Sequence, residues 1–231
     1  MKTIVLIPGY MCDEQIWINQ LTKLKKKYKV IIPSLKRGKT IKEFSLNTLK
    51  LLPKKFSIVG FSMGGFIALD LAINYSNRLE SLVLVGTNAR SVSKDRRRLL
   101  KKSQDELTNK NYIKRFSQSS FDSYISKNNQ KNKSYLRLIK SMVKNHSLLC
   151  LKRQSNAILK RPRLLNKLSK ITSRCLIIVG SDDTLSSKEM NIELNKNIRG
   201  SELFFIKQSG HFVMIEQSQK FNKLFFKWLE Y

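Results

Sequence analysis

The chain has 231 residues, 41% of them hydrophobic and 26% charged, a composition that is typical of a globular protein and excludes a disordered one. This length suits one hydrophobic core with an insertion better than two separate domains. The net charge of +29 at pH 7 is expected to attract anionic partners over the whole surface, but it carries no information about the fold.

The first predicted element is a buried strand over residues 3–7, which ends at Pro8 and Gly9 and is too short for the core of a signal peptide. Further short apolar runs predict strands, and helical patterns lie between them. The predicted strands are 3–7, 30–32, 56–59, 82–85, 175–179 and 203–206. The predicted helices are 14–27, 41–52, 63–75, 187–197 and 221–229. Strands that alternate with helices indicate an α/β fold whose mostly parallel sheet of about six strands is flanked by helices.

Residues 90–170 break this alternation, because they are polar, helical in pattern and without a convincing buried strand. We expect this segment to form a helical lid inserted into a core made of residues 1–89 and 171–231. The segment carries 23 Lys or Arg residues against 4 Asp or Glu residues, so it holds 19 of the 29 net positive charges. Its apolar positions recur at helical spacing and are expected to pack on the core.

The strongest functional signal is the sequence GFSMGG at residues 60–65, between the predicted strand 56–59 and an apolar helix. A turn this tight crowds the residues two before and two after Ser62, and Gly60 and Gly64 fit there without a clash. The turn is expected to project Ser62 Oγ above the sheet, at a helix N-terminus that favours a developing negative charge. Ser62 is therefore the candidate nucleophile, and a simple glycine-rich turn is the alternative.

A serine needs a base to remove its proton, and the chain contains two histidines. His211 follows the predicted strand 203–206, in a loop from which its ring is expected to reach the sheet edge. His146 lies in the basic segment and is expected to be a surface or packing residue. We therefore expect His211 to be the base.

The base needs a carboxylate that fixes its tautomer and stabilises the imidazolium formed during attack. Asp182 and Asp183 end the predicted strand 175–179, at the same sheet edge as Ser62, and the residues by themselves leave both open. The aspartate that does not hold the histidine is expected to serve a turn or a helix cap. Asp70 is a weaker candidate, because it lies about two turns into the helix after Ser62.

The oxyanion formed during attack is usually stabilised by two backbone N–H groups, one after the serine and one in the loop after the first strand. Met63 and Tyr10 occupy these positions.

The chain contains three cysteines, an odd number, and their wide spacing shows no metal-ligand pattern: Cys12, Cys150 and Cys175. No apolar run approaches the roughly 20 residues that cross a bilayer. We expect a cytoplasmic protein without a cofactor, a metal or a membrane span.

These motifs together resemble the α/β-hydrolase superfamily, particularly its small carboxylesterases with a helical lid. The resemblance implies a catalytic triad of Ser62, Asp183 and His211, because the superfamily's acid typically stands three residues after a glycine, here Gly180. Residues 8–17 also resemble the corresponding loop of the esterases that remove the methyl group from pimeloyl-acyl carrier protein. A departure is Pro8-Gly9, where family members commonly have His-Gly.

Three functions are compatible with these residues. A serine nucleophile favours hydrolysis of small-molecule carboxylic esters through an acyl-enzyme intermediate over the superfamily branches that use an aspartate. The second candidate is an esterase or thioesterase for acyl groups on acidic acyl carrier protein or coenzyme A, attracted by the basic residues 90–170. The third is a non-catalytic anion-binding protein on the same fold. Codon usage in an AT-rich genome would equally explain the charge, and no motif predicts specific nucleic-acid binding.

Overall fold

The computed structural model describes residues 1–230 and contains one six-stranded sheet in the order β2-β1-β3-β4-β5-β6. Every pair of neighbouring strands is parallel, which confirms the predicted α/β fold. The strands extend beyond the apolar runs because ladder pairing continues at polar positions such as Lys2, which pairs with Tyr28. Their bounds are β1 (Lys2–Ile7), β2 (Tyr28–Ile31), β3 (Phe56–Phe61), β4 (Leu79–Val85), β5 (Arg174–Gly180) and β6 (Glu202–Ile206).

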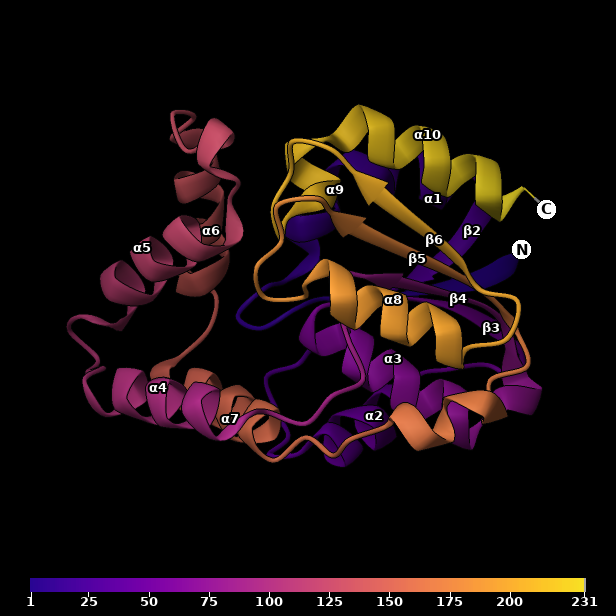
Figure 1. The fold of residues 1–231 in the computed structure, drawn as a ribbon, viewed down its shortest axis with the longest axis horizontal. Coiled ribbons are helices and arrows are strands. Elements are labelled where there is room, and N and C mark those ends of the chain that lie inside the picture. Colours follow the sequence, from indigo (N-terminus) through magenta and orange to yellow (C-terminus); the bar gives the residue numbers. More distant parts are fainter. Residues whose placement is uncertain (231) are drawn as a thin grey trace.

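Helices cover both faces of the sheet (Figure 1). They are α1 (Ile18–Lys27), α2 (Ile41–Leu49), α3 (Met63–Asn74), α8 (Lys188–Asn197), α9 (Val213–Glu216) and α10 (Ser218–Leu229), with the short 3-10 helices η1 (Glu14–Trp17) and η2 (Ser76–Arg78). Along β1, Ile4 and Leu6 pack toward α1 and α10, whereas Val5 and Ile7 pack toward α2 and α3. Burial on both faces explains why the strands read as continuous apolar runs.

Helix boundaries differ from the predicted ones where the backbone leaves the helical region. The predicted helix over 14–27 is divided into η1 and α1, because the backbone of Trp17 has φ −104° and ψ 12° between them. The predicted helix over 187–197 begins at Lys188, because Ser187 is its N-cap and accepts a hydrogen bond from Met190 N. The short helix α9 is an addition to the predicted elements, and the last helix begins at Ser218 instead of 221.

Residues 90–170, all of which the structure describes, are helical and contain no strand. In Figure 1 their four α-helices form an arc on the side toward which the arrowheads of β5 and β6 point. Ile139 and Met142 join the same apolar core as Trp17 and Phe61, so part of the arc packs on the sheet domain. The elements are α4 (Lys94–Asp105), α5 (Tyr112–Tyr124), η3 (Lys127–Asn129), α6 (Ser134–Lys144), α7 (Leu148–Leu159) and η4 (Leu165–Lys170).

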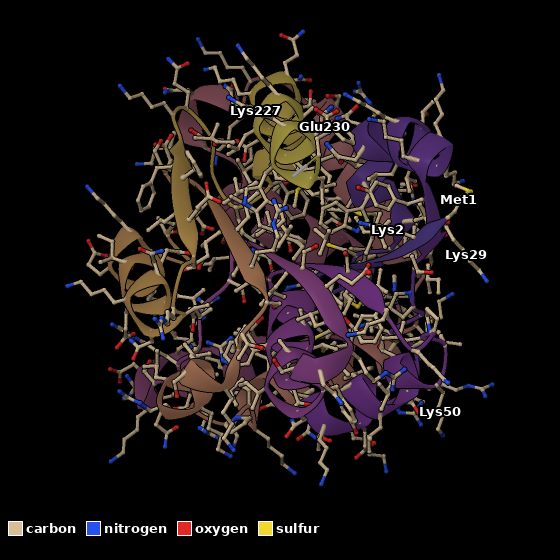
Figure 2. The ribbon with its side chains drawn as sticks, turned by 90° about the vertical axis from the view of Figure 1, so that its right-hand side faces the viewer. Met1, Lys2, Lys29, Lys50, Lys227 and Glu230 are labelled. Atoms are coloured by element: carbon tan, nitrogen blue, oxygen red, sulfur yellow. The ribbon has the colours of Figure 1, made fainter. Side chains whose placement is uncertain are left out.

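Basic side chains also cover the opposite side of the molecule. Figure 2 looks at the end of the fold that lies away from the helical arc, where Lys2, Lys29, Lys50 and Lys227 are exposed. The net charge is therefore concentrated in residues 90–170 without being confined to them. Within residues 1–230, no helix has the length and apolar character needed to cross a membrane, and no group of histidine, cysteine and acidic side chains is placed to hold a metal ion.

Candidate active site

Ser62 stands at a sharp turn between β3 and α3. Its backbone has φ 53° and ψ −115°, a conformation that is strained for a residue with a side chain. Two hydrogen bonds hold the turn: Ser62 N donates to Val85 O at 2.9 Å, and Thr87 Oγ1 donates to Ser62 O at 2.9 Å. Ser62 is half-buried, so its hydroxyl remains within reach of a bound molecule. This strained strand–turn–helix geometry is that of a nucleophile elbow.

The glycines on either side of Ser62 permit close backbone contacts. A Cβ atom on Gly64 would lie 2.3 Å from Ile7 O and 2.4 Å from Pro8 O, and one on Gly60 would lie 2.6 Å from Gly64 O. All three distances to backbone oxygens are too short for a side chain at either glycine. The elbow therefore touches the loop after β1 backbone to backbone, which brings Ser62 next to that loop.

The structure brings Ser62, His211 and Asp183 together. His211 Nε2 lies 2.8 Å from Ser62 Oγ, and His211 Nδ1 lies 2.7 Å from Asp183 Oδ2. The other carboxylate oxygen, Asp183 Oδ1, accepts hydrogen bonds from Leu185 N at 2.8 Å and Ser186 N at 3.0 Å. These two bonds fix the carboxylate so that Oδ2 faces the imidazole. Both His211 and Asp183 are buried, which strengthens their interaction.

Asp182 has a different set of contacts. Its Oδ2 accepts a hydrogen bond from Ser126 Oγ at 2.6 Å, and its Oδ1 accepts one from Ser181 Oγ at 2.7 Å. The geometry therefore distinguishes the two aspartates that the residues alone left open. We expected the aspartate that does not hold the histidine to stabilise the turn. Instead, Asp183 accepts hydrogen bonds from both the turn and His211, whereas Asp182 contacts the segment after α5.

The other two residues considered from the sequence lie elsewhere. His146 is buried between α6 and α7, with Nδ1 2.8 Å from Met142 O, so it is a packing residue of the helical segment. Asp70 accepts a hydrogen bond from Asn74 Nδ2 at 3.3 Å within α3. Neither side chain contacts Ser62 or His211.

Two backbone N–H groups near Ser62 have no hydrogen-bond acceptor in the described part of the chain. Among residues 1–230, neither Tyr10 N nor Met63 N donates a hydrogen bond. Met63 N is the first N–H of α3, where the helix dipole favours negative charge. Tyr10 N belongs to the loop that Gly64 contacts, and this loop turns at Met11, whose φ of 54° lies in the left-handed region.

Side chains from residues 90–170 form a wall next to these groups. The Tyr10 ring meets Phe116 edge-on, with centroids 5.0 Å apart, and its hydroxyl is hydrogen-bonded to Ser155. The ring of Tyr124 lies 5.2 Å from the ring of His211. Burial raises the pKa of Tyr10 and raises the pKa of Tyr124 to about 12, so both phenols are neutral near pH 7. These side chains are therefore uncharged near pH 7, while the guanidinium of Arg96 lies close enough to Tyr124 to act on its pKa.

Two polar residues of the site escaped the sequence reasoning. Gln154 of α7 accepts a hydrogen bond from Met11 N at 2.8 Å, and Glu216 of α9 accepts one from Gly210 N at 2.9 Å. Both side chains are buried. A polar residue among apolar neighbours could have indicated both of them. Gln154 lies on the buried face of α7, and Glu216 follows the apolar run 212–215.

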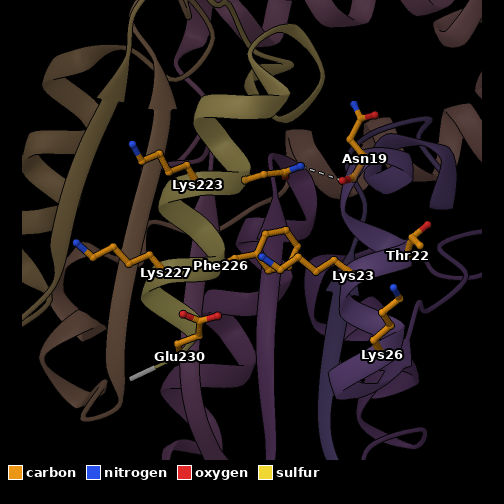
Figure 3. Close-up of a pocket in the computed structure, with 9 residues that line it drawn as sticks. Asn19, Thr22, Lys23, Lys26, Lys223, Phe226, Lys227 and Glu230 are labelled. Atoms are coloured by element: carbon orange, nitrogen blue, oxygen red, sulfur yellow. Dashed lines mark hydrogen bonds between the residues drawn. The ribbon is translucent and has the colours of Figure 1, made fainter.

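Two hollows occur outside the triad. A groove of about 650 Å³ lies between α1 and α10, and Figure 3 shows Lys23 of α1 across the ring of Phe226 of α10, 4.3 Å from its centroid. Lysine side chains frame this groove, and none of its lining residues is Ser62, His211 or an aspartate. A smaller hollow of about 320 Å³ lies behind the loop after β1, lined by Cys12 and His146 among others. Neither hollow contains the nucleophile.

At the carboxyl edge of a parallel sheet with helices on both faces, a strained serine is hydrogen-bonded to a histidine, which in turn is hydrogen-bonded to an aspartate. This arrangement defines an α/β protein of the hydrolase type. Residues 42–218 match the model of the alpha/beta hydrolase fold family, and the chain belongs to this family. The family resemblance expected from the sequence is thereby confirmed.

Curated relatives share only part of the chain. A protein from Legionella pneumophila (strain Corby), named pimeloyl-[acyl-carrier protein] methyl ester esterase, is 37% identical over 95 residues, which are 39% of this chain and 40% of that protein. A protein of the same name from Aromatoleum aromaticum is 33% identical over 92 residues, 37% of each chain. The matched region thus spans about two fifths of the length of these relatives.

Solved structures resemble the whole chain. An esterase from Thermogutta terrifontis superposes with a TM-score of 0.87 at 20% identity, covering 100% of this chain and 90% of that one. An enol-lactonase from Burkholderia xenovorans superposes with a TM-score of 0.88 at 18% identity, covering 100% and 92%. At these identities the likeness establishes the fold.

Proposed function

We propose that this chain hydrolyses carboxylic esters through an acyl-enzyme intermediate on Ser62. The observation that carries the proposal is the continuous series of hydrogen bonds from Asp183 through His211 to Ser62, with distances of 2.7 and 2.8 Å. A serine hydroxyl is weakly nucleophilic by itself and becomes reactive when a positioned base takes its proton. The names of the curated relatives support the same reaction class.

In the first half of the reaction, Ser62 Oγ attacks the ester carbonyl carbon while His211 Nε2 takes the Oγ proton. The carbonyl oxygen becomes negatively charged, and the free N–H groups of Tyr10 and Met63 donate hydrogen bonds to it. Asp183 accepts the Nδ1–H of His211, which keeps the correct tautomer and stabilises the imidazolium. When the tetrahedral intermediate collapses, the ester C–O bond breaks and the alcohol leaves with the proton from Nε2.

In the second half, a water molecule attacks the acyl-enzyme carbonyl and gives a proton to His211 Nε2. The bond between the acyl carbon and Ser62 Oγ then breaks, and Oγ recovers its proton from Nε2. The carboxylic acid leaves and the enzyme is regenerated. His211 thus acts once as base and once as acid in each half-reaction.

We assign residues 90–170 the role of a lid over the core formed by residues 1–89 and 171–231. The assignment is supported by the wall that Phe116, Tyr124 and Ser155 form around Tyr10 and His211. The aromatic side chains of this wall suit the acyl chain of an ester, because apolar surface is removed from water on binding. Specificity for the acyl group then depends on this segment.

The substrate that we favour is the ester of an acyl chain held on an acidic carrier. The name of the relatives, pimeloyl-[acyl-carrier protein] methyl ester esterase, and the net charge of residues 90–170 both support it. A coenzyme A ester would be attracted by the same charge. We place the reaction in the cytoplasm, in keeping with three free and buried cysteines.

The test uses Ser62→Ala, with Ser76→Ala in the short helix η2 as the matched control. Purified protein is assayed with p-nitrophenyl esters of increasing chain length and treated with a fluorophosphonate probe, whose label is located by mass spectrometry. We expect the native chain and the control to hydrolyse esters and to be labelled at Ser62, and Ser62→Ala to fold but lose both properties. Labelling at another residue, or full activity of Ser62→Ala, contradicts the proposal.

A further inference from the structure

Glu216 places a buried carboxylate where two distant segments of the chain meet. Its Oε1 accepts a hydrogen bond from Gly210 N at 2.9 Å. Its Oε2 accepts one from Ser126 N at 2.9 Å and one from Asn129 Nδ2 at 2.9 Å. One oxygen therefore holds the loop that carries His211, and the other holds the chain that leaves α5.

The two segments are in direct backbone contact at this point. His211 N donates to Tyr124 O at 2.7 Å. A Cβ atom on Gly210 would lie 2.5 Å from Tyr124 O and 2.8 Å from Ser126 N, so the chains approach as closely as glycine permits. Movement of residues 124–129 relative to this loop would therefore shift the main chain of His211.

Neutral hydrogen-bond donors, and no cation of the described residues, satisfy the carboxylate of Glu216. Within residues 1–230, Glu216 forms no ion pair, and its hydrogen-bond donors are neutral N–H groups. Burial raises the pKa of Glu216, while these hydrogen bonds lower it. Burying an acidic group without a cation is unfavourable unless hydrogen bonds satisfy it. Burial of the carboxylate is thus unfavourable by itself. Its two oxygens accept hydrogen bonds from the two segments that meet at His211.

We propose that Glu216 is a positioning residue, which fastens the His211 loop to residues 124–129 and so keeps His211 Nε2 within hydrogen-bonding distance of Ser62 Oγ. The inference rests on the proposed function, because His211 serves there as the base. Glu216 itself contacts neither Ser62 nor the ring of His211, so it acts through the position of His211. Asp182 supports the same junction from the other side, since its Oδ2 accepts a hydrogen bond from Ser126 Oγ at 2.6 Å.

The principal test is Glu216→Gln, which keeps the size of the side chain but replaces one acceptor oxygen by an NH₂ group. That group would face either Gly210 N or Ser126 N, donor against donor, so one of the two attachments is lost. We expect kcat for a small neutral ester to fall about 100-fold, the loss that a misplacement of about 1 Å causes, with KM nearly unchanged. The rate of fluorophosphonate labelling of Ser62 should fall with kcat.

A readout that needs no substrate is the Nδ1 proton of His211, observed by NMR after ¹⁵N-histidine labelling. The chain has only two histidines, so His146→Gln assigns the remaining ring signals to His211. We expect the hydrogen-bonded Nδ1 proton to be sharp in the native chain and broadened or shifted in Glu216→Gln. Glu202→Gln is the matched control, because Glu202 accepts a hydrogen bond from Trp228 Nε1 far from the loop and should leave this signal unchanged.

Asn129→Ala keeps the carboxylate and removes one of its three donors, so it tests the proposal even if Glu216→Gln fails to fold. It should show a smaller change of the same kind in kcat and in the His211 signal. A melting temperature that falls while kcat per folded molecule, the labelling rate and the His211 signal stay native would overturn the proposal. If the native chain hydrolyses no ester, the proposed function fails, and the His211 signal still decides the role of Glu216.

Discussion

Gln154 Oε1 accepts a hydrogen bond from Met11 N at 2.8 Å, although 143 residues separate them in the chain. The amide of the same side chain donates to Leu35 O at 2.8 Å. Helix α7 of the inserted segment therefore holds the loop after β1, next to the free N–H of Tyr10. Because Met11 has a φ of 54°, this loop needs outside support to keep its shape.

The first prediction is that Gln154→Leu impairs both stability and turnover. The variant leaves the buried Met11 N without a partner, which costs about 1–3 kcal/mol. Leu35 O keeps only the weak thiol donor of Cys150, at 3.7 Å. We expect kcat for a small ester to fall at least about 10-fold, less than the roughly 100- to 1000-fold caused by losing a whole oxyanion donor. Chemical denaturation and steady-state kinetics measure the two effects.

The control is Gln118→Leu, on the exposed face of α5. Equal stability and equal kcat of the two variants would show that Gln154 does not support the loop.

The second prediction separates the two aspartates. Asp183→Asn should lower kcat about 10⁴-fold, because an amide at this position holds the wrong tautomer of His211. Asp182→Asn should change kcat only a few-fold, because an amide oxygen can still accept the hydrogen bond from Ser126. Both variants are compared in one ester assay at constant pH. A larger loss in Asp182→Asn would reverse the assignment of the acid.

The third prediction concerns Gly86, which has a φ of 52° and lies beneath the triad. A Cβ atom there would lie 3.2 Å from His211 Nδ1 and 3.3 Å from Asp183 Oδ2. Gly86→Ala should therefore lower kcat, and the left-handed backbone should cost about 1–2 kcal/mol of stability.

The matched control for Gly86 is Gly200→Ala. Gly200 has a φ of 69° with nothing within 4 Å of the added Cβ, so it shares the backbone strain without the contacts. Its variant should lose similar stability and keep native kcat. If Gly86→Ala also keeps native kcat, the space beside His211 is not critical.

The fourth prediction tests whether the basic segment recruits an acidic carrier. Long-range attraction should raise kcat/KM for a carrier-bound acyl ester, and added salt should remove that advantage by screening. The same acyl group as a free methyl ester should respond little to salt. Replacing Arg96, Arg97 and Arg98 of α4 by glutamate should weaken turnover of the carrier substrate and leave that of the free ester nearly unchanged.

The control for this charge reversal is the lysine groove between α1 and α10. Replacing Lys23, Lys26 and Lys223 by glutamate changes the net charge of the protein by the same amount, on elements other than the inserted segment. Selective loss in the α4 variant alone supports a carrier surface on residues 90–170. Equal effects of both variants, or equal salt slopes for the two substrates, would indicate that only the overall charge matters.

The order of strands and helices could be predicted from the sequence because its causes are local. A run such as 175–179 is apolar on every residue, and only a strand buried on both faces explains that at this length. The elbow at 60–65 was likewise readable from its glycine pattern, because a side chain at Gly60 would collide with the backbone of Gly64, only four residues on. The atoms that exclude a side chain at Gly64 itself belong to Ile7 and Pro8, a contact that only the fold reveals. The division of helix 14–27 at Trp17 was missed, and the start of helix 187–197 was placed one residue early, because single backbone angles and caps set these points.

Contacts between distant segments were decided only by the tertiary structure. Asp182 and Asp183 are adjacent and chemically identical, yet Asp182 meets Ser126 and Asp183 meets His211, since neighbouring residues direct their side chains to different places. The roles of Gln154 and Glu216 depend on partners 143 and 90 residues away. The sequence determined which chemistry the sheet edge offers, through local turns and residue types. The packing of residues 90–170 against the sheet edge decided which polar groups hold the site loops in place. A hydrogen bond between distant residues forms only when the whole fold brings the donor and the acceptor together.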